Sequence, residues 1–565
     1  MAFNQKSIVE VNPSGDDDNG GGFSTAGTGF NTDGAATAAN TSAPVFTSAS
    51  YTFVAGDQDD WIYIKTGANW IPGFYRIASV AGGAATLEAT IGLATIQDGI
   101  LSTVVGCATV ESPSSATWGI DRSRRTAAYV AFTDLVIDAV TNTKCTSVLS
   151  PFVSADAGQF INITAGTGWT VQRVEILSVT AGVATCDRAL GTTGSIGGTG
   201  NMGGALLTVQ KGLDTITTAD MTMWVKGTGT ADYLITAGLT CPTVAGSKYQ
   251  IRIMGYRTTR GDKLQPEIKA NANTITPFIA YTTLNGSEWH NFILNGDYPT
   301  RTGGKGPAPA TTGFSMFNCV MKNFGDRGFH GTSGRYLLYG CEVTNCANTA
   351  GSGAVEGTAG GQGAVMYSWI HANPKTGGYF VAGGIDIALI GNRFEKNTGA
   401  TSDGCEIEHR NLVIGNIFDG NGRDGLRANT NYAFNIQSDV ANNIFSNNTA
   451  FGLNVTGTPA YADNNRRHHN GYYNNTSGAR STNINKGVGE VDCTADPFTD
   501  SANGDFTLNN TAGGGAALRA AGFPGVAVGS AAIGYQDIGI YQHEDSGGDV
   551  GGGTTRRERV CWPFP

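Results

Sequence analysis

The chain contains 565 residues, and glycine occupies 82 of them, about 15%, roughly twice the usual share. Charged residues make up 15%, against about 25% in an average globular protein, so the composition excludes coiled coils and most helical bundles. The 36 Lys and Arg residues against 46 Asp and Glu give a net charge of −10, which argues against nucleic acid as a partner.

Apolar residues supply 40% of the chain, enough for a hydrophobic core. No apolar run reaches the roughly 18 residues of a membrane span, and residues 1–11 lack the basic-then-apolar layout of a signal peptide. We therefore expect a protein that folds in a reducing cytoplasm. The ten cysteines include no CxxC pair, which favours small buried thiols over disulfides or zinc. Phosphate-binding and Rossmann motifs are absent, so we expect no cofactor.

Residues 1–45 are rich in glycine, aspartate and threonine, as in the run Asp16–Phe23. Such a composition buries too little apolar surface to fold alone. The sequence therefore predicts either a disordered segment or an extended arm that becomes ordered only against a partner.

Two β modules, 46–120 and 128–212, are predicted next because the segments 53–92 and 152–191 match at a constant offset of 99, with 14 of 40 residues identical. Both copies alternate apolar and polar residues and then turn at glycine, which is typical of strands. The repeated Asp57 and Asp156 favour a role in turns. The repeated Trp70 and Trp169 are candidates for stacking on a glycan, with packing inside the module as the alternative.

From residue 213 to about 545 a looser repeat predicts a parallel β-solenoid. Similar segments such as Gly391–Phe394 and Gly415–Phe418 recur at steps of 22, 27, 24, 24 and 27 residues, with asparagine and glycine at the corners. Leucine-rich repeats share this period but need a leucine consensus that is missing. At about 24 residues per coil, the segment predicts 13 or 14 coils that end near Asp537–Tyr541. Residues 546–565 follow as a glycine linker and a tag of basic and aromatic residues, which is either a docking peptide or a frayed tail.

Several of these segments carry a family resemblance. The opening Glu10–Asp16 with Asn19–Phe23, the stretch Trp118–Asp121 and the segment Gly198–Leu206 resemble the N-terminal part of β-helical virion proteins of tailed bacteriophages. The coils and the ending Asp537–Tyr541 are similar to right-handed β-helices, which include tailspikes, polysaccharide lyases and bacterial surface proteins.

The resemblance implies an all-β protein with a right-handed parallel β-helix. It also implies a homotrimeric spike or decoration protein on the exterior of the virion, assembled in the host cytoplasm. Its N-terminal arm and β modules would contact other virion proteins. Arg122–Arg125 depart from the more polar residues of the family at this point.

The densest polar segment is Asp403–Arg410, followed one coil later by Asp424. Alternation places Glu406 and Glu408 on one outer face, about 6.5–7 Å apart, at the lower edge of the range for inverting glycosidases. The alternative is an exposed ionic ladder, because alignment of the coils stacks Glu406 on Arg427 and then on Asn454. An arginine beside Glu406 predicts that this carboxylate stays ionised at neutral pH, which suits it poorly to proton donation. Asp424 is a weaker candidate for a catalytic acid.

No metal site is predicted. His468 and His469 are adjacent, and neighbouring side chains on an extended chain point to opposite sides. Two functions remain: a structural virion protein that contacts host polysaccharide, and a tailspike depolymerase that cleaves it. A secreted adhesin or lyase is disfavoured by the expected lack of a signal peptide.

Overall fold

The protein is represented by a computed structural model, which divides the chain into two units: residues 1–233 with 244–266, and residues 234–243 with 267–565. His409, the stretch Arg122–Arg125 and the C-terminal tag lie outside the described residues. Within the described part of the chain, no helix is long and apolar enough to span a membrane. The described residues are 8–22, 30–37, 43–67, 70, 73–87, 116–121, 129–216, 221–229, 231–241, 251–273, 275, 278–281, 286–302, 304–309, 313–332, 334–349, 352–358, 362–381, 386–408, 410–430, 438–457, 466–519, 521–523 and 537–541.

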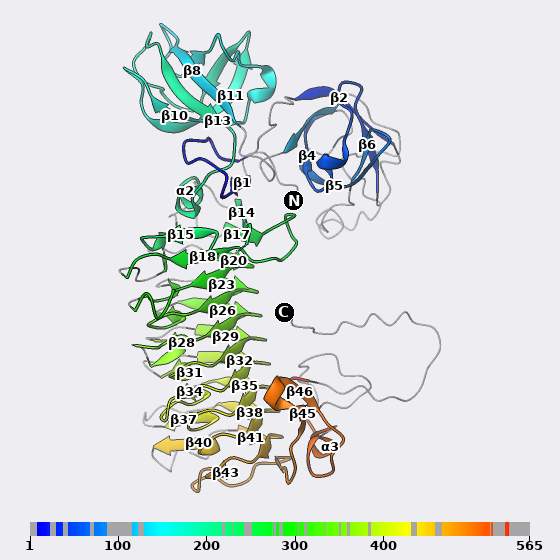
Figure 1. Cartoon of the computed structure of the whole chain (residues 1–565), viewed down its shortest axis with the longest axis vertical. Coiled ribbons are helices and arrows are strands. Elements are labelled where there is room, and N and C mark those ends of the chain that lie inside the picture. The colour runs from blue at the N-terminus through cyan, green and yellow to red at the C-terminus, as the bar shows by residue number, and fades with distance from the viewer. Residues whose placement is uncertain are drawn as a thin grey trace. The chain divides into compact units, whose positions relative to one another are not determined.

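The first unit contains two closed β barrels with the same strand order (Figure 1). Each barrel has a core of buried aromatic and aliphatic side chains that alternate along its strands. The first comprises β2 (Asn31–Thr37), β3 (Val45–Thr47), β4 (Trp61–Thr66), β5 (Gly73–Ala81), β6 (Ala84–Leu87) and β7 (Ala116–Asp121). The second comprises β8 (Val130–Ile137), β9 (Lys144–Thr146), β10 (Phe160–Ala165), β11 (Gln172–Thr180), β12 (Val183–Cys186) and β13 (Gly198–Met202).

The predicted start of the first module at residue 46 is wrong, because β2 closes the barrel between β3 and β7. Short 3₁₀ turns, Ala55–Asp57 and Ser154–Asp156, occupy equivalent places in the two barrels. Asp57 Oδ2 accepts a hydrogen bond from the Val54 N–H, and Asp156 Oδ2 accepts one from the Val153 N–H, at 3.0 and 2.9 Å. The turn role of both aspartates is therefore confirmed.

Residues 8–22 are ordered by the chain itself, which corrects the prediction of an arm that needs a partner. Strand β1 (Ile8–Val11) pairs in parallel with β14 (Thr222–Lys226), which pairs with β17 (Ile251–Tyr256). The Asp17 carboxylate accepts hydrogen bonds from the N–H groups of Leu207 and Thr208, just before helix α2 (Val209–Asp214). Strand pairing, polar side chains that bind backbone groups and the buried side chains of Ile8, Val9 and Val11 thus anchor this segment.

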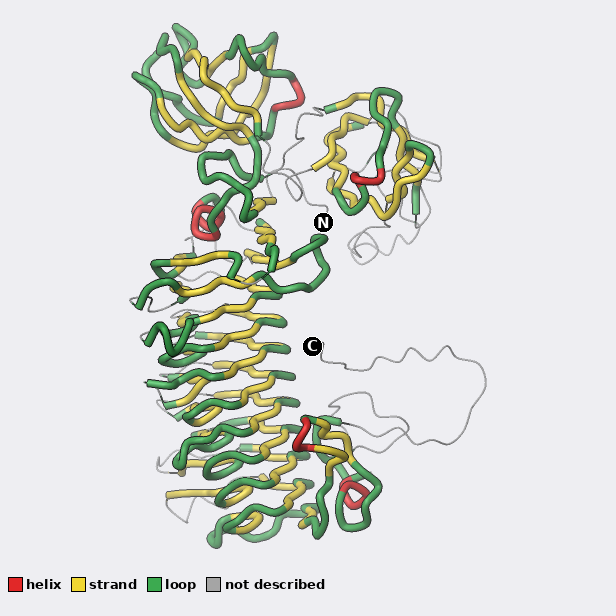
Figure 2. Tube along the Cα trace, in the orientation of Figure 1, coloured by secondary structure: helices red, strands yellow, loops and turns green. Residues whose placement is uncertain are grey.

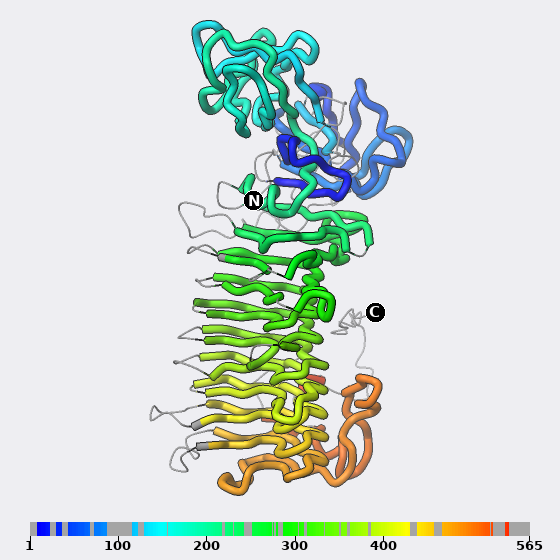
Figure 3. Tube along the Cα trace, turned by 60° about the vertical axis from the view of Figure 1, so that its left-hand side comes forward, coloured from blue at the N-terminus to red at the C-terminus, as the bar shows by residue number. Residues whose placement is uncertain are grey.

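The second unit is a parallel β-solenoid, as predicted. Its strands stack coil upon coil with little helix, and the layers are visible from two directions (Figures 2 and 3). In the described residues, the first sheet of this unit comprises β20 (Ser287–His290), β23 (Phe314–Phe317), β26 (Arg335–Tyr339), β29 (Gln362–Met366), β32 (Asp386–Ile390), β35 (Leu412–Ile414), β38 (Asp439–Ala441) and β41 (Arg466–His468).

The other faces of the coils form the second and third sheets. The second sheet comprises β15 (Tyr233–Ile235), β18 (Glu267–Ala270), β21 (Ile293–Asn295), β24 (Val320–Lys322), β27 (Glu342–Thr344), β30 (Trp369–His371), β33 (Arg393–Glu395), β36 (Ile417–Asp419), β39 (Ile444–Ser446), β42 (Gly471–Tyr473) and β44 (Val491–Asp492). The third sheet comprises β25 (Phe329–Gly331), β28 (Gly353–Gly357), β31 (Thr376–Phe380), β34 (Cys405–Ile407), β37 (Leu426–Thr430), β40 (Phe451–Gly457) and β43 (Gly478–Arg480), and a short sheet joins β16 (Leu239–Thr240), β19 (Ile279–Tyr281) and β22 (Ala308–Pro309).

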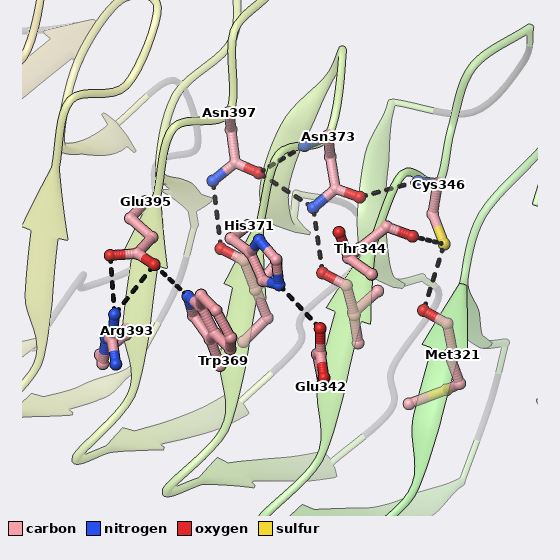
Figure 4. Close-up of polar contacts among 12 residues, drawn as sticks. Met321, Glu342, Thr344, Cys346, Trp369, His371, Asn373, Arg393, Glu395 and Asn397 are labelled. Carbon is pink, nitrogen blue, oxygen red and sulfur yellow. Dashed lines mark hydrogen bonds and ion pairs between the residues drawn. The ribbon is translucent and has the colours of Figure 1, made fainter. Parts of the chain in front are cut away.

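Asparagine ladders explain why this sequence forms coils. On one side of the second sheet the side-chain amides of Asn392, Asn416, Asn443 and Asn470 bond from coil to coil, and a second ladder contains Asn373 and Asn397 (Figure 4). Gly391 and Gly415 precede the first ladder with φ of 64° and 65°, a conformation that glycine adopts without strain. Inside, the rings of Phe394, Phe418, Phe445 and Tyr472 stack at about 5 Å.

The solenoid has fewer coils than the 13 or 14 predicted. The second sheet contains eleven strands in the described residues, because the chain after residue 495 leaves the stack. It forms β45 (Phe498–Asp500), β46 (Asp505–Leu508) and α3 (Gly515–Leu518), which lie beside the lower coils in Figure 1. Ile538 and Ile540 pack on Ile417 and Ile444, so the segment 537–541 covers outer side chains of the second sheet instead of ending the rod.

Candidate functional site

Six outward-facing side chains form a polar row along the third sheet, one from each of six consecutive strands. We call this row the third-sheet ladder. The strand register places each residue beside the next, and residues on either side of the row, such as Cys405 and Ile407, point into the core. The ladder consists of His330, Glu356, Tyr379, Glu406, Arg427 and Asn454.

The predicted stack of Glu406 on Arg427 and Asn454 is confirmed. Arg427 Nε lies 3.8 Å from Glu406 Oε1, and Arg423 Nη2 lies 4.0 Å from Glu406 Oε2. The side chain of Glu406 is only 12% exposed, so the ladder is half-buried here and not the fully exposed row that was expected. At such contacts the two guanidinium groups only partly offset the burial of the carboxylate.

Asp403 and Asp424 form a buried acidic pair beside the ladder. Arg423 binds both carboxylate oxygens of Asp403, whose side chain is fully buried, and its Nε lies 3.8 Å from Asp424 Oδ2. The Asn454 amide donates to Asp424 Oδ2 at 2.8 Å. Burial raises the pKa of Asp424, although hydrogen bonds from Asn454 and the Phe451 N–H oppose this effect. Arg423 and Asn454 therefore position two acids next to Glu406.

Burial changes the acidity of two carboxyl groups in this segment, Glu406 and Glu408. Burial raises the pKa of Glu406, and Arg427 only partly counteracts it. Burial and the neighbouring Glu406 raise the pKa of Glu408 to about 7. The prediction that Glu406 stays ionised beside an arginine considered only the arginine, whereas burial of the carboxyl group acts in the opposite direction.

The upper part of the ladder is equally buried. Arg327 Nε lies 2.5 Å from Glu356 Oε2, and His330 Nε2 lies 3.8 Å from Glu356 Oε1. Burial, together with Lys305 and Arg327, lowers the pKa of His330 to about 4, so its imidazole is neutral at physiological pH. Burial and the adjacent carboxylates, Glu406 first, raise the pKa of Tyr379. The row thus combines neutral hydrogen-bonding groups, such as the His330 imidazole, with charged ones, such as the Arg427 guanidinium.

Sequence analysis missed a second cluster, on the second sheet. His371 Nε2 lies 2.9 Å from Glu342 Oε1, and the His371 ring stacks on Trp369 with centroids 3.6 Å apart. Arg393 lies over the Trp369 ring at 4.8 Å and pairs with Glu395, to which the Trp369 indole also donates (Figure 4). His371 and Arg393 therefore both contact the Trp369 ring. The aligned coil segments already place the residues in neighbouring strands, which was the available signal.

The tryptophans proposed for glycan stacking lie inside the barrels. Trp70 is 6% exposed and Trp169 is 8% exposed, each within its barrel core. Buried indoles offer no ring face to a sugar, so that candidate role is wrong and the packing alternative holds.

The two adjacent histidines converge, contrary to the prediction. The Nδ1 atoms of His468 and His469 lie 3.2 Å apart, because His469 has a φ of 53° and the chain is not extended there. No group of three or more potential metal ligands is assembled in the residues that the structure describes. Eight cysteines among these residues are free, and seven of them are buried, as predicted for small buried thiols.

No protein-family model matches the chain, and no curated protein matches it. Among solved structures the chain is similar to ORF18 of Geobacillus virus E2, with 11% identity over 48% of this chain and 56% of that chain and a TM-score of 0.32. It is similar to the catalytic domain of a GH87 α-1,3-glucanase in complex with nigerose, with 11% identity, 64% and 90% coverage and a TM-score of 0.31. Tailspike protein 3 of bacteriophage CBA120 matches with 13% identity, 49% and 57% coverage and a TM-score of 0.25.

The chain therefore spans little more than half the length of the two phage proteins. At identities of 11–13% these similarities concern the β-helical fold alone and assign no activity.

Proposed function

We propose that this chain is a spike or fibre subunit of a tailed-phage particle whose third-sheet ladder binds polysaccharide on the host surface. The ladder itself carries the proposal. Its side chains follow one another at the strand spacing of about 4.8 Å, close to the length of one sugar residue. A linear glycan lying along the solenoid axis would meet one carboxylate, phenol, guanidinium or amide per sugar, and these groups bond hydroxyls well.

In this proposal the N-terminal region attaches the protein to the particle, and three chains form the spike. The family resemblance supports both points. The second barrel also exposes aliphatic side chains that a partner would cover: Val140 is 86% exposed, Val148 83% and Ile196 70%. Measurement of the native mass tests the trimer, which requires three times 58.6 kDa. A monomeric mass contradicts it.

Glycan binding is tested with purified host capsule and lipopolysaccharide. We expect wild-type protein to bind one of them and Glu406→Gln and Arg427→Gln to weaken binding at least tenfold, since each removes a charged hydrogen-bonding group. Glu288→Gln serves as a matched control, because Glu288 lies in β20 of the first sheet. Equal binding by all three variants and the wild type contradicts the proposal.

A second candidate, hydrolysis of the bound glycan, is favoured by the position of Glu408 beside Glu406. A carboxyl group with a pKa of about 7 remains partly protonated at neutral pH and suits a general acid. Glu406 or Asp424 would then activate the water that adds across the glycosidic bond. Release of new reducing ends by the wild type, abolished in Glu408→Gln, supports hydrolysis. Binding without any product leaves the protein a binding spike.

A further inference from the structure

An open groove of about 390 Å³ lies on the first sheet, where β29, β32, β35 and β38 begin. It arises from the sizes of successive outward side chains. The row formed by Leu337, Ala364, Ala388 and Leu412 places two alanines between two leucines. Ala388 lines the groove and lacks the bulk of Leu412 beside it in the next coil, so the outer surface is hollowed at this level of the stack.

The groove combines an apolar floor with a polar rim. Ala388 and Leu412 contribute apolar surface, and Leu412 is 37% exposed. Asp386, Arg410 and Asp439 contribute planar charged groups at the rim. The ion pair between Arg410 and Asp386 is long, at 3.4 Å, and its side chains are 69% and 37% exposed. Such an exposed pair is weak, so a ligand hydroxyl can replace it at little cost.

This composition fits a sugar ring better than a peptide or a lipid. A pyranose presents an apolar face of C–H groups and an edge of hydroxyls, and small-molecule sites typically pair an apolar surface with a few directed polar groups. The rim carries two carboxylates and one guanidinium, a net formal charge of −1. Carboxylate repulsion therefore disfavours acidic sugars.

The groove adjoins the third-sheet ladder around one corner of the coil. Asn411, a lining residue, donates its side-chain N–H to the carbonyl of Glu408, which follows the strand of Glu406. We propose that this groove is a subsite for one uncharged pyranose residue, as a branch or continuation of the polysaccharide bound by the ladder. The inference rests on the proposed function and specifies the chemistry of one sugar.

Saturation-transfer NMR on the full chain tests the subsite with methyl glucopyranoside, methyl galactopyranoside and N-acetylglucosamine, and with glucuronate as the acidic comparison. We expect at least one neutral sugar to bind and glucuronate to bind at least tenfold more weakly. Ala388→Trp fills the groove and should weaken binding at least tenfold. Ser315→Trp introduces the same ring three coils away on the same row and should leave binding unchanged.

Arg410→Ala provides a second test that does not depend on accommodating a tryptophan, and it should weaken binding about threefold to tenfold. The inference is overturned if no neutral sugar binds, if glucuronate binds as tightly, or if Ala388→Trp and Arg410→Ala both bind like the wild type. Binding of host polysaccharide distinguishes failure of the subsite from failure of the proposed function. If it binds the wild type and Ala388→Trp equally, the subsite fails while the proposed function stands; if it does not bind the wild type, the proposed function fails.

Discussion

Asparagine side chains line a corner of the solenoid and ionisable side chains line the outer face of its third sheet, with one residue per coil in both rows. The Asn416 amide makes four hydrogen bonds: Oδ1 accepts two from Asn392, and Nδ2 donates to the carbonyl of Leu389 and to Asn443 Oδ1, all within 3.0 Å. Glu406, in contrast, lies 3.8 and 4.0 Å from its two arginine partners.

The two rows differ in how fully their buried polar groups are hydrogen-bonded, and this difference separates a stabilising row from a binding row. A neutral amide both donates and accepts, so a column of asparagines satisfies itself while fully buried. A column that contains carboxylates cannot do so, and burial raises the pKa values of Glu406, Glu408 and Asp424. Groups placed at a cost to folding are typical of binding and catalytic surfaces. We infer that the asparagine ladder stabilises the rod and that the third-sheet ladder contacts a ligand.

The largest expected effect is on the asparagine ladder. Asn416→Ala removes a fully buried amide together with its four hydrogen bonds, which should lower the free energy of unfolding of the solenoid by about 4 kcal/mol. Urea denaturation followed by circular dichroism measures the loss. A decrease below about 1 kcal/mol would contradict the stabilising role of this ladder.

Arg423→Ala should have the next largest effect, because it leaves the fully buried Asp403 carboxylate without its guanidinium partner. We expect a loss of about 2–3 kcal/mol, below the usual range for a buried pair because Arg423 is partly exposed. Arg410→Ala is the matched control, with an expected loss below about 0.5 kcal/mol for an exposed pair. Asp403→Asn combined with Arg423→Ala should recover part of the loss. Equal losses for both single variants would show that the acidic pair is not buried as described.

Glu408→Gln should stabilise the protein in a pH-dependent way. Below pH 4.5 Glu408 carries its proton in both the folded and unfolded chain, so the variant should match the wild type. As the pH rises through about 7, the wild type must ionise a buried group and loses stability that the glutamine keeps. We expect a melting temperature about 1–2 °C above wild type at pH 8 and no difference at pH 4. A variant that is less stable at pH 8 would contradict the raised pKa.

A small change in stability is expected for Asn454→Ala, the ladder's own asparagine. Its amide makes one described side-chain hydrogen bond, to Asp424, and the residue is only partly buried. We expect a loss below about 1 kcal/mol together with a roughly threefold weaker affinity for host polysaccharide. A loss equal to that of Asn416→Ala would remove the distinction between the two ladders.

The coil register was predictable from the sequence because the corner residues mark it. The steps of 22, 27, 24, 24 and 27 residues reappear in the strand pairing that begins Val320 to Glu342 and Glu342 to Trp369. Strand β2 was missed because its small polar residues lack hydrophobic alternation and pair only once the barrel closes. Ile538 and Ile540 were mistaken for a coil because alternation does not reveal whether a strand joins a stack or covers its outside.

Part of the third-sheet ladder could be predicted from the alignment of the coils. Alignment on Gly404 and Gly425 placed Glu406 beside Arg427, and extending it to Gly377 adds Tyr379 in the same row. The acidity of Glu408 was not predictable, because it depends on burial by residues from other coils. The groove at Ala388 was missed for the same reason, since a hollow depends on the side chains of neighbouring coils and not on one segment.

A structure of the chain with host polysaccharide bound is the most direct test of glycan binding by the third-sheet ladder. We expect a glycan chain that runs along the third sheet and contacts Tyr379, Glu406 and Arg427 in successive coils. A glycan bound on another face of the solenoid or on a barrel, with no contact to these residues, would contradict it.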